Sequence, residues 1–371
     1  MAWVDFFIIL CRTDTSVTTR SSVQTSHHVG VTLPRVPMDP TTTIATADFL
    51  AERAAASERR LSTFRKEVSD AVPQLKECPE LCIYTTGSFG RREAGRFSDL
   101  DLFFVLDDKG DPKAKIPHLT KTLIDADLIR HCKKLEYPPF SKDGVYLKVH
   151  TITDLSKKIG NQHEDSENIF TARMLLFLES TPLYNASVYH ATIQACVREY
   201  CRDHSDHADN FRPLFLVNDI ARFWKTLCLN YESARTGASE ADTPKHKLKN
   251  LKLKYSRMMT CYSMLACLCD REEADNPEKL TRLVEMTPLQ RLMHISVKHE
   301  TSGLTELYSA LATEYEWFLQ ETDREEADTL RWIVENKGAV SKRSPRFGDF
   351  MFQLLTKVAE ATRGDLHYLV V

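Results

Sequence analysis

The sequence predicts an α+β fold in which a small sheet-containing domain is followed by an all-helical domain. Short apolar or alternating segments typical of strands occur only in the first half, at residues 81–85, 99–106 and 144–152. From about residue 154 onward, apolar residues recur at helical spacing. The chain has 371 residues, which is long enough for two domains of ordinary size.

The elements of the first domain follow in a clear order. A helical pattern over residues 46–70 precedes the first strand, and Gly87-Ser88 follows that strand at once. The second strand opens at Asp99, a helix is predicted over residues 116–134, and the third strand alternates through residues 144–152. Residues 1–44 are rich in Ser, Thr and Val and predict a disordered extension, so the sheet-containing domain is assigned to residues 45–155.

The second domain, residues 156–371, consists of a series of predicted helices separated by prolines or a polar break. These helices cover residues 165–180, 185–203, 211–235, 246–270, 278–298, 303–321, 324–336 and 347–362. The breaks fall at Pro182, Pro213, residues 237–244, Pro277, Pro288 and Pro345.

Composition narrows the class of protein. Apolar residues make up 42% of the chain, charged residues 27%, and the formal charge is -3, so the basic excess of a general nucleic-acid binder is missing. No run reaches the roughly 18 to 20 apolar residues that a membrane helix needs, so no membrane partner is expected. The ten cysteines lack paired CxxC spacing and are interpreted as reduced, buried thiols of a cytoplasmic chain.

The strongest chemical signal is Asp99-Leu100-Asp101 at the start of the second strand. Alternation places the two carboxylates on one face while Leu100, Leu102 and Phe104 enter the core. Residues two apart on a strand lie about 6.5 to 7 Å apart at Cα, which suits ligation of a pair of Mg²⁺ ions about 3.5 to 4 Å apart. Asp99 and Asp101 are therefore the candidate catalytic and metal-binding residues.

A candidate phosphate site precedes them. Gly87-Ser88 lies between an apolar strand and a predicted helix start, where free backbone N–H groups and the helix dipole favour an anion. Glycine also permits close approach of the backbone. Either motif alone is common in turns, and their order along the chain carries more weight than either one.

At these residues the chain resembles nucleotidyltransferases of the DNA polymerase beta superfamily. Gly87-Ser88-Phe89-Gly90-Arg91-Arg92-Glu93, continued by Ser98-Asp99-Leu100-Asp101, resembles the signature of the branch that contains the PII uridylyltransferase. The marker of this branch is Gly-Arg-x-Glu between the Gly-Ser turn and Ser-Asp-x-Asp. Val149-His150-Thr151 and the segment Thr171-Ala172-Arg173-Met174-Leu175 are similar to later elements of that branch.

The resemblance implies a small mixed sheet, Mg²⁺ or Mn²⁺ as cofactor and a nucleoside triphosphate as substrate. It makes residues 45–155 the catalytic domain. Most members place a third carboxylate on the later strand, where this chain has Lys148 and His150. His150 is therefore a candidate catalytic base or substitute ligand. Other candidates for the third ligand are Asp143, Asp154 and Glu164-Asp165, and spacing does not choose among them.

Several basic residues are candidates for nucleotide binding. A guanidinium matches phosphate oxygens, so Arg91 is a candidate clamp, with Glu93 orienting it. On the helix over residues 211–235, Arg222 and Lys225 continue a polar stripe, and Lys254 lies in the basic cluster of the next helix. Related enzymes hold the triphosphate with such residues, and a solvated helix face is the alternative for each.

These observations predict transfer of a nucleoside monophosphate to an acceptor, either a protein or a small molecule, with release of pyrophosphate. The alternative is a nucleotide sensor or a toxin-antitoxin partner that keeps the fold without turnover, because the third carboxylate is missing.

Overall fold

The computed structural model describes residues 40–362 without 112, 141–143, 145–146, 162–163, 165–166 and 237–242, and it also describes Leu366. Residues 1–39 of the predicted extension and the candidate ligands Asp143 and Asp165 lie outside the described residues. Residues 40–44 are helical, in contrast to the prediction, because helix α2 spans Pro40–Ala71 and begins before residue 46.

A four-stranded mixed sheet confirms the predicted fold class. Its strands are β1 (Leu81–Thr85), β2 (Leu102–Leu106), β3 (Val149–Thr151) and β4 (Thr181–Tyr184). They lie in the order β3-β2-β1-β4, with β1 antiparallel to both β2 and β4 and with β2 parallel to β3. The sheet is therefore small, and β1 and β2 occupy its centre.

Strand β4 corrects the prediction that strands end near residue 154. Its four residues contain Pro182, which cannot donate to a ladder and is tolerated because β4 is an edge strand. A short edge strand with a proline gives no alternating signal, and for this reason Thr181-Pro182 was interpreted as a break between helices. Strands β2 and β3 are shorter than predicted, since β2 begins at Leu102 and β3 at Val149.

Both faces of the sheet are buried, which explains the nearly continuous apolar sequence of β1 and β2. Leu102 and Phe104 share a buried cluster with residues of α2 and of α4 (His118–Lys134). Phe103 and Val105 face the opposite cluster. The helices of that second cluster next to the sheet include α5 (Ile152–Lys157), α6 (Ile169–Leu178) and α7 (Ala186–Tyr200).

The rest of the described chain is mostly helical. Its α-helices are α8 (Leu214–Thr236), α9 (Thr243–Lys252), α10 (Met258–Cys269), α11 (Pro277–Glu285), α12 (Pro288–Lys298), α13 (Leu304–Glu321), α14 (Glu326–Glu335) and α15 (Lys337–Thr362). A π-helix, η6 (Leu253–Arg257), joins α9 to α10. The short 3₁₀ helices are η1 (Pro73–Glu77), η3 (His204–Asp206), η4 (Ala208–Asn210), η7 (Arg271–Glu273) and η8 (Glu300–Ser302).

Two proline predictions had different outcomes. Pro288 separates α11 from α12, as its position at the start of a helix favours. Pro345 lies inside α15 and does not break it, so this helix begins ten residues before the predicted start at 347, at Lys337. Packing of the buried face of α15, which includes Phe347 and Met351, outweighs the local cost of the proline.

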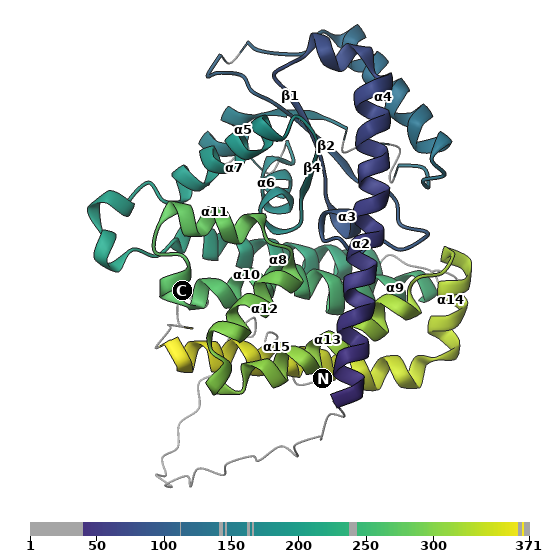
Figure 1. The fold of residues 1–371 in the computed structure, drawn as a ribbon, viewed down its shortest axis with the longest axis vertical. Coiled ribbons are helices and arrows are strands. Elements are labelled where there is room, and N and C mark those ends of the chain that lie inside the picture. The colour runs from purple at the N-terminus through teal and green to yellow at the C-terminus, as the bar shows by residue number, and fades with distance from the viewer. Residues whose placement is uncertain are drawn as a thin grey trace, which may run out of the picture.

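Helix α2 connects the two parts of the molecule. Figure 1 shows it running along both, and it contacts α4 and β4 at the sheet and α13 in the helical part. One apolar cluster also continues from Tyr84 and Phe103 of the sheet into the C-terminal helices. The domain boundary at residue 155 stays a prediction.

No helix among the described residues is long and apolar enough to cross a membrane.

Candidate active site

The predicted phosphate turn lies at the end of β1. Gly87 has a φ of +66°, a left-handed conformation that favours glycine, and it opens the single-turn helix α3 (Gly87–Gly90). Thr86 occupies the N-cap position and makes no side-chain capping bond. The first N–H groups of a helix have no acceptor in the preceding turn. The amides of Ser88 and Phe89 lie at this position in α3.

The two acids lie beside this turn. The N–H of Thr86 donates to the carbonyl oxygen of Asp101 over 3.0 Å, and the Thr85 hydroxyl donates to the same oxygen over 2.9 Å. A Cβ atom on Gly87 would stand only 2.9 Å from Asp101 Oδ2, so the carboxylate lies against the backbone of the turn. The absence of a side chain at Gly87 makes this approach feasible.

Asp99 and Asp101 precede β2 and do not form part of it. Both are half-buried, whereas Leu100 between them is 1% exposed and joins the cluster under α2 and α4. The expected alternation is therefore kept in the loop, and the two acids project away from that core. The prediction was wrong only about the start of the second strand, which begins at Leu102 and not at Asp99.

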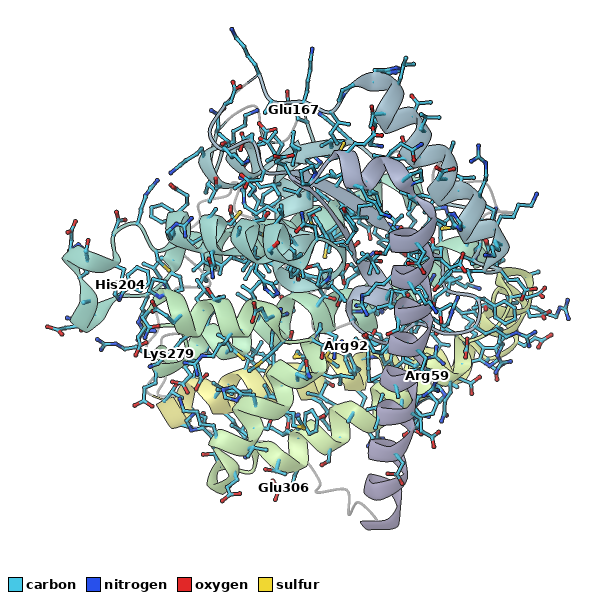
Figure 2. All side chains as sticks on the ribbon, turned by 45° about the horizontal axis from the view of Figure 1, so that its top comes forward. Arg59, Arg92, Glu167, His204, Lys279 and Glu306 are labelled. Carbon is cyan, nitrogen blue, oxygen red and sulfur yellow. The ribbon has the colours of Figure 1, made fainter. Side chains whose placement is uncertain are left out.

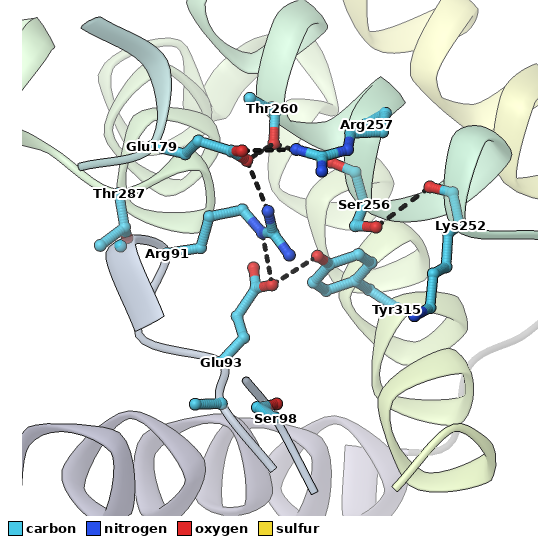
Figure 3. A network of polar contacts seen from close by, with 12 residues as sticks. Arg91, Glu93, Ser98, Glu179, Lys252, Ser256, Arg257, Thr260, Thr287 and Tyr315 are labelled. Atoms are coloured by element: carbon cyan, nitrogen blue, oxygen red, sulfur yellow. Dashed lines mark hydrogen bonds and ion pairs between the residues drawn. The ribbon is translucent and has the colours of Figure 1, made fainter. Parts of the chain in front are cut away.

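Arg91 lies in a buried network of ion pairs. It is 7% exposed, and its guanidinium donates to two buried carboxylates, Glu93 Oε2 at 2.8 Å and Glu179 Oε2 at 2.5 Å (Figure 3). The expected orienting role of Glu93 fits these contacts. Its Nε and Nη1 are thus used within the protein, and the nucleotide-binding role of Arg91 stays a prediction.

Glu179 joins this network to the helical part. Its carboxylate accepts from Arg257 Nη1 at 2.5 Å and from the Thr260 hydroxyl at 2.8 Å. Burial opposes ionisation, but Arg257 and Arg91 hold the pKa of Glu179 at about 2. The hydroxyl of Tyr315 on α13 donates to Glu93 Oε2 at 2.8 Å. The motif Gly-Arg-x-Glu therefore connects the turn with α10 and α13.

Close backbone packing fixes the same segment. A Cβ atom on Gly90 would lie 1.9 Å from the carbonyl oxygen of Glu179, so only glycine allows α3 to approach the end of α6. The Nε of Arg53 on α2 donates to the carbonyl of Glu93 at 2.9 Å, and its Nη1 pairs with Asp323 at 2.7 Å. The N–H of Arg96 also donates to Asp323. The segment that precedes Asp99 is therefore fixed by contacts with Arg53, Asp323 and Glu179.

Lys252, at the end of α9, belongs to the basic cluster visible in the sequence, but the sequence did not single it out as a candidate. Desolvation lowers the pKa of Lys252, Asp99 and Glu326 raise it, and Arg257 and Arg91 lower it further. The side chain is exposed, and its charge interacts with that of Asp99. Figure 3 shows it beside the Arg91 network. The lysine-rich sequence around it was visible, but its approach to Asp99 depends on the tertiary fold.

His150 lies on β3, opposite the part of β2 that follows the acids. It pairs in register with Val105 of β2, which lies four residues after Asp101, or about 13 Å along a strand. It is 3% exposed, and burial, followed by Lys148, lowers its pKa to about 4 against the opposing effects of Asp154 and Glu167. The parallel register thus places His150 toward the other end of the strand from the acids, and its catalytic role stays a prediction that this geometry does not favour.

The basic residues predicted on the helices are not gathered at the turn. Arg222 donates to buried Glu164 and stacks on Phe170, with its guanidinium carbon 3.6 Å from the ring centre. These contacts belong to a second network around Arg173, so the geometry does not support nucleotide binding by Arg222. Lys225 is exposed, and desolvation lowers the pKa of Lys254. The roles of Lys225 and Lys254 stay predictions.

The described candidates for a third metal ligand are engaged elsewhere. The Asp154 carboxylate accepts from the N–H of Thr151 in the capping box of α5 and pairs with Lys158. Glu164 is buried between Arg173 and Arg222. Within the ranges that the structure describes, no group of three or more His, Cys, Asp or Glu side chains could hold a metal ion. The pair Asp99 and Asp101 is thus the oxygen-donor set that the geometry offers at the turn.

The comparison with protein families agrees with this geometry. Residues 61–166 match the model of a family described as the nucleotidyltransferase domain. The match spans the Gly87 turn, both acids and the first three strands, and it supports nucleotidyl transfer as the general activity. It does not extend to the helices that carry Lys252 and Arg257. No curated protein matches the chain. Membership of the uridylyltransferase branch stays a prediction.

Proposed function

We propose that this protein transfers a nucleoside monophosphate from a nucleoside triphosphate to an acceptor hydroxyl and releases pyrophosphate. The observation that carries the proposal is the position of Asp101, whose carboxylate lies against the Gly87 turn. A phosphate seated on the amides of Ser88 and Phe89 would thus stand next to the acid pair. The match to nucleotidyltransferase domains supports the same reaction class.

The donor chemistry of the pair fits a hard divalent ion. Magnesium prefers oxygen ligands and often binds proteins through one or two carboxylates, leaving its other positions to water and phosphate. Asp99 and Asp101 would hold Mg²⁺ or Mn²⁺ in this way. When bound, the ion supplies charge neutralisation on the phosphates and lowers the pKa of a coordinated hydroxyl.

The chain's own residues bind and orient the triphosphate. The Gly87-Ser88 turn presents backbone N–H groups, and Lys252 contributes a positive charge on the side of Asp99. In the reaction, a bond forms between the acceptor oxygen and the α-phosphorus while the bond to the β-phosphate oxygen breaks. Pyrophosphate leaves, and the hydroxyl proton passes to solvent.

The buried network around Arg91 has a positioning role in this proposal. It fixes the loop from Glu93 to Ser98, which leads directly into the acids, against α2, α10 and α13. Rigid placement matters because nucleotidyl transfer depends mainly on orientation and electrostatic stabilisation.

Pyrophosphate release tests the proposal. Purified protein is incubated with each of the four ribonucleoside triphosphates, Mg²⁺ and a cell lysate as a source of acceptors, and the Asp101→Asn variant serves as the matched control. We expect release with at least one triphosphate by the wild type and none above background by the variant. Equal release by both proteins would overturn the proposal.

The second candidate function is a nucleotide sensor without turnover. The observation that favours it is the engagement of Asp154 and Glu164 in other contacts, which leaves two acids at the turn among the described residues. Calorimetric titration separates the two functions. Saturable triphosphate binding without pyrophosphate release, under conditions with lysate present, identifies a sensor.

A further inference from the structure

A cavity of about 290 Å³ lies behind the Arg91 network, between α2, α12 and α13. The loop that carries Arg92 and Glu93 forms one of its walls. Its apolar lining comes mainly from Leu50, Ala54, Leu289, Met293, Tyr308 and Leu319. This volume is close to the lower limit for small-molecule sites, which are typically concave and mostly apolar with few polar groups.

The charged groups of the cavity are predominantly cationic. Three arginines, Arg53, Arg91 and Arg92, line it together with one carboxylate, Glu93. Arg53 is occupied by Asp323, and Arg91 by Glu93 and Glu179. In the part of the chain that the structure describes, Arg92 makes no ion pair with a carboxylate. It therefore supplies the cation that is available to a ligand.

The backbone at Arg92 supports a specific role for this side chain. Its φ is +59°, in the left-handed region, which is uncommon for a residue other than glycine, asparagine or aspartate. Such a conformation persists only where the surrounding structure imposes it. Here the hydrogen bond from the Arg92 N–H to the Phe89 carbonyl and the burial of both Arg91 and Glu93 fix it. As a result, the exposed Arg92 side chain borders the cavity. Figure 2 labels Arg92 near the long N-terminal helix α2.

We propose that this cavity binds a small carboxylate with an apolar body, whose anionic group pairs with Arg92. An apolar chain fits against Leu50, Leu289 and Met293, and Met293 is 47% exposed in the absence of such a contact. The guanidinium offers paired donors that match the two oxygens of a carboxylate. Neither Asp99 nor Asp101 lines this cavity, and the proposal does not depend on the function proposed above.

Calorimetric titration of the full chain with octanoate tests the proposal, with octanamide as the neutral probe of similar shape. We expect saturable octanoate binding and at least tenfold weaker octanamide binding. Arg92→Gln should weaken octanoate binding at least tenfold, whereas Arg92→Lys, which keeps the charge, should retain most of it. Thermal unfolding without probe checks that each variant is folded.

A second pair of variants tests the location. Ala54→Leu adds a side chain into the cavity and should weaken octanoate binding, whereas Ala55→Leu on the exposed side of the same helix should not. The proposal is overturned if octanoate fails to bind in the millimolar range or if octanamide binds equally well. It is also overturned if the folded Arg92→Gln and Ala54→Leu variants bind octanoate as the wild type does.

Discussion

The carboxylate of Asp101 lies against Gly87, which precedes it by fourteen residues, and hydrogen bonds from Thr85 and Thr86 to the Asp101 carbonyl oxygen hold the two segments together. A Cβ atom at Gly87 would approach Asp101 Oδ2 to 2.9 Å, and Gly87 also has a left-handed φ of +66°. Two independent constraints thus require glycine at this position, and one of them comes from a candidate metal ligand.

Replacing Gly87 by alanine tests this contact. We expect Gly87→Ala to displace the Asp101 carboxylate and reduce pyrophosphate release by about 100-fold or more, because small misplacements of reacting groups are costly. Gly110→Ala is the matched control, since Gly110 also has a positive φ, +80°, and a Cβ atom there meets nothing within 4 Å. Steady-state rates of both variants, with thermal unfolding as a check of folding, decide the question. Similar losses in both variants would argue against the contact.

Lys252 should act on the triphosphate. Because a charge-assisted hydrogen bond contributes about 1.5 to 3 kcal/mol, Lys252→Ala should raise the KM for the triphosphate about tenfold or more. Lys245→Ala on the same helix is the control, because no contact of Lys245 with the acids is seen and its side chain is exposed. The measurement is a titration of rate against triphosphate concentration. Identical KM values for the two variants would remove Lys252 from the site.

The buried Glu179 network makes stability depend on acid pH. Arg257 and Arg91 offset the effect of burial and keep the pKa of Glu179 at about 2 in the folded protein, below its usual value of 4.5. Since the unfolded chain takes up this proton first, the contribution is complete above about pH 4.5 and is lost as the pH falls toward 2.

Removing that charge should be strongly destabilising. Glu179→Gln leaves Arg91 and Arg257 without a shared carboxylate, and breaking a buried ion pair typically costs about 3 to 5 kcal/mol. Urea unfolding at neutral pH measures this loss, with exposed Glu285→Gln as the control. An unchanged free energy of unfolding in Glu179→Gln would show that the network contributes little.

His150 should affect stability and not turnover. Burial lowers its pKa to about 4, so the unfolded chain binds a proton at His150 before the folded protein does. Stability from this group is therefore present above about pH 6.5 and declines as the pH falls toward 4. His150→Gln should flatten this part of the stability profile and leave pyrophosphate release at neutral pH within about threefold of the wild type. A large loss of activity in a folded variant would restore the catalytic role.

The parts of the structure that were predicted correctly depend on local sequence patterns. The apolar run of β1, the Gly87 turn and the alternation through Leu100 and Leu102 are all contained within about twenty residues. Strand β4 escaped prediction because it is four residues long and contains Pro182, so neither periodicity nor composition distinguishes it from a helix break.

The surroundings of Arg91, His150 and Lys252 could not be predicted from the sequence, because contacts between distant segments determine them. Arg91 meets Glu179 across 88 positions in the sequence, and nothing near Arg91 indicates that its donors will be used there. The register of β3 against β2 places His150 opposite Val105 and away from Asp101, and the packing of α9 brings Lys252 toward Asp99. A motif identifies candidate residue types, whereas the tertiary fold decides which of them face the turn.

The most direct test of the central claim follows the fate of a labelled phosphate. Wild-type protein is incubated with lysate and with the triphosphate that supports pyrophosphate release, labelled in parallel samples on the α- or the γ-phosphorus. The account predicts that the α-label becomes attached to an acceptor, that the γ-label appears in pyrophosphate, and that Asp99→Asn and Asp101→Asn abolish both. Transfer of the γ-label to the acceptor, or undiminished α-label transfer by the two variants, would contradict it.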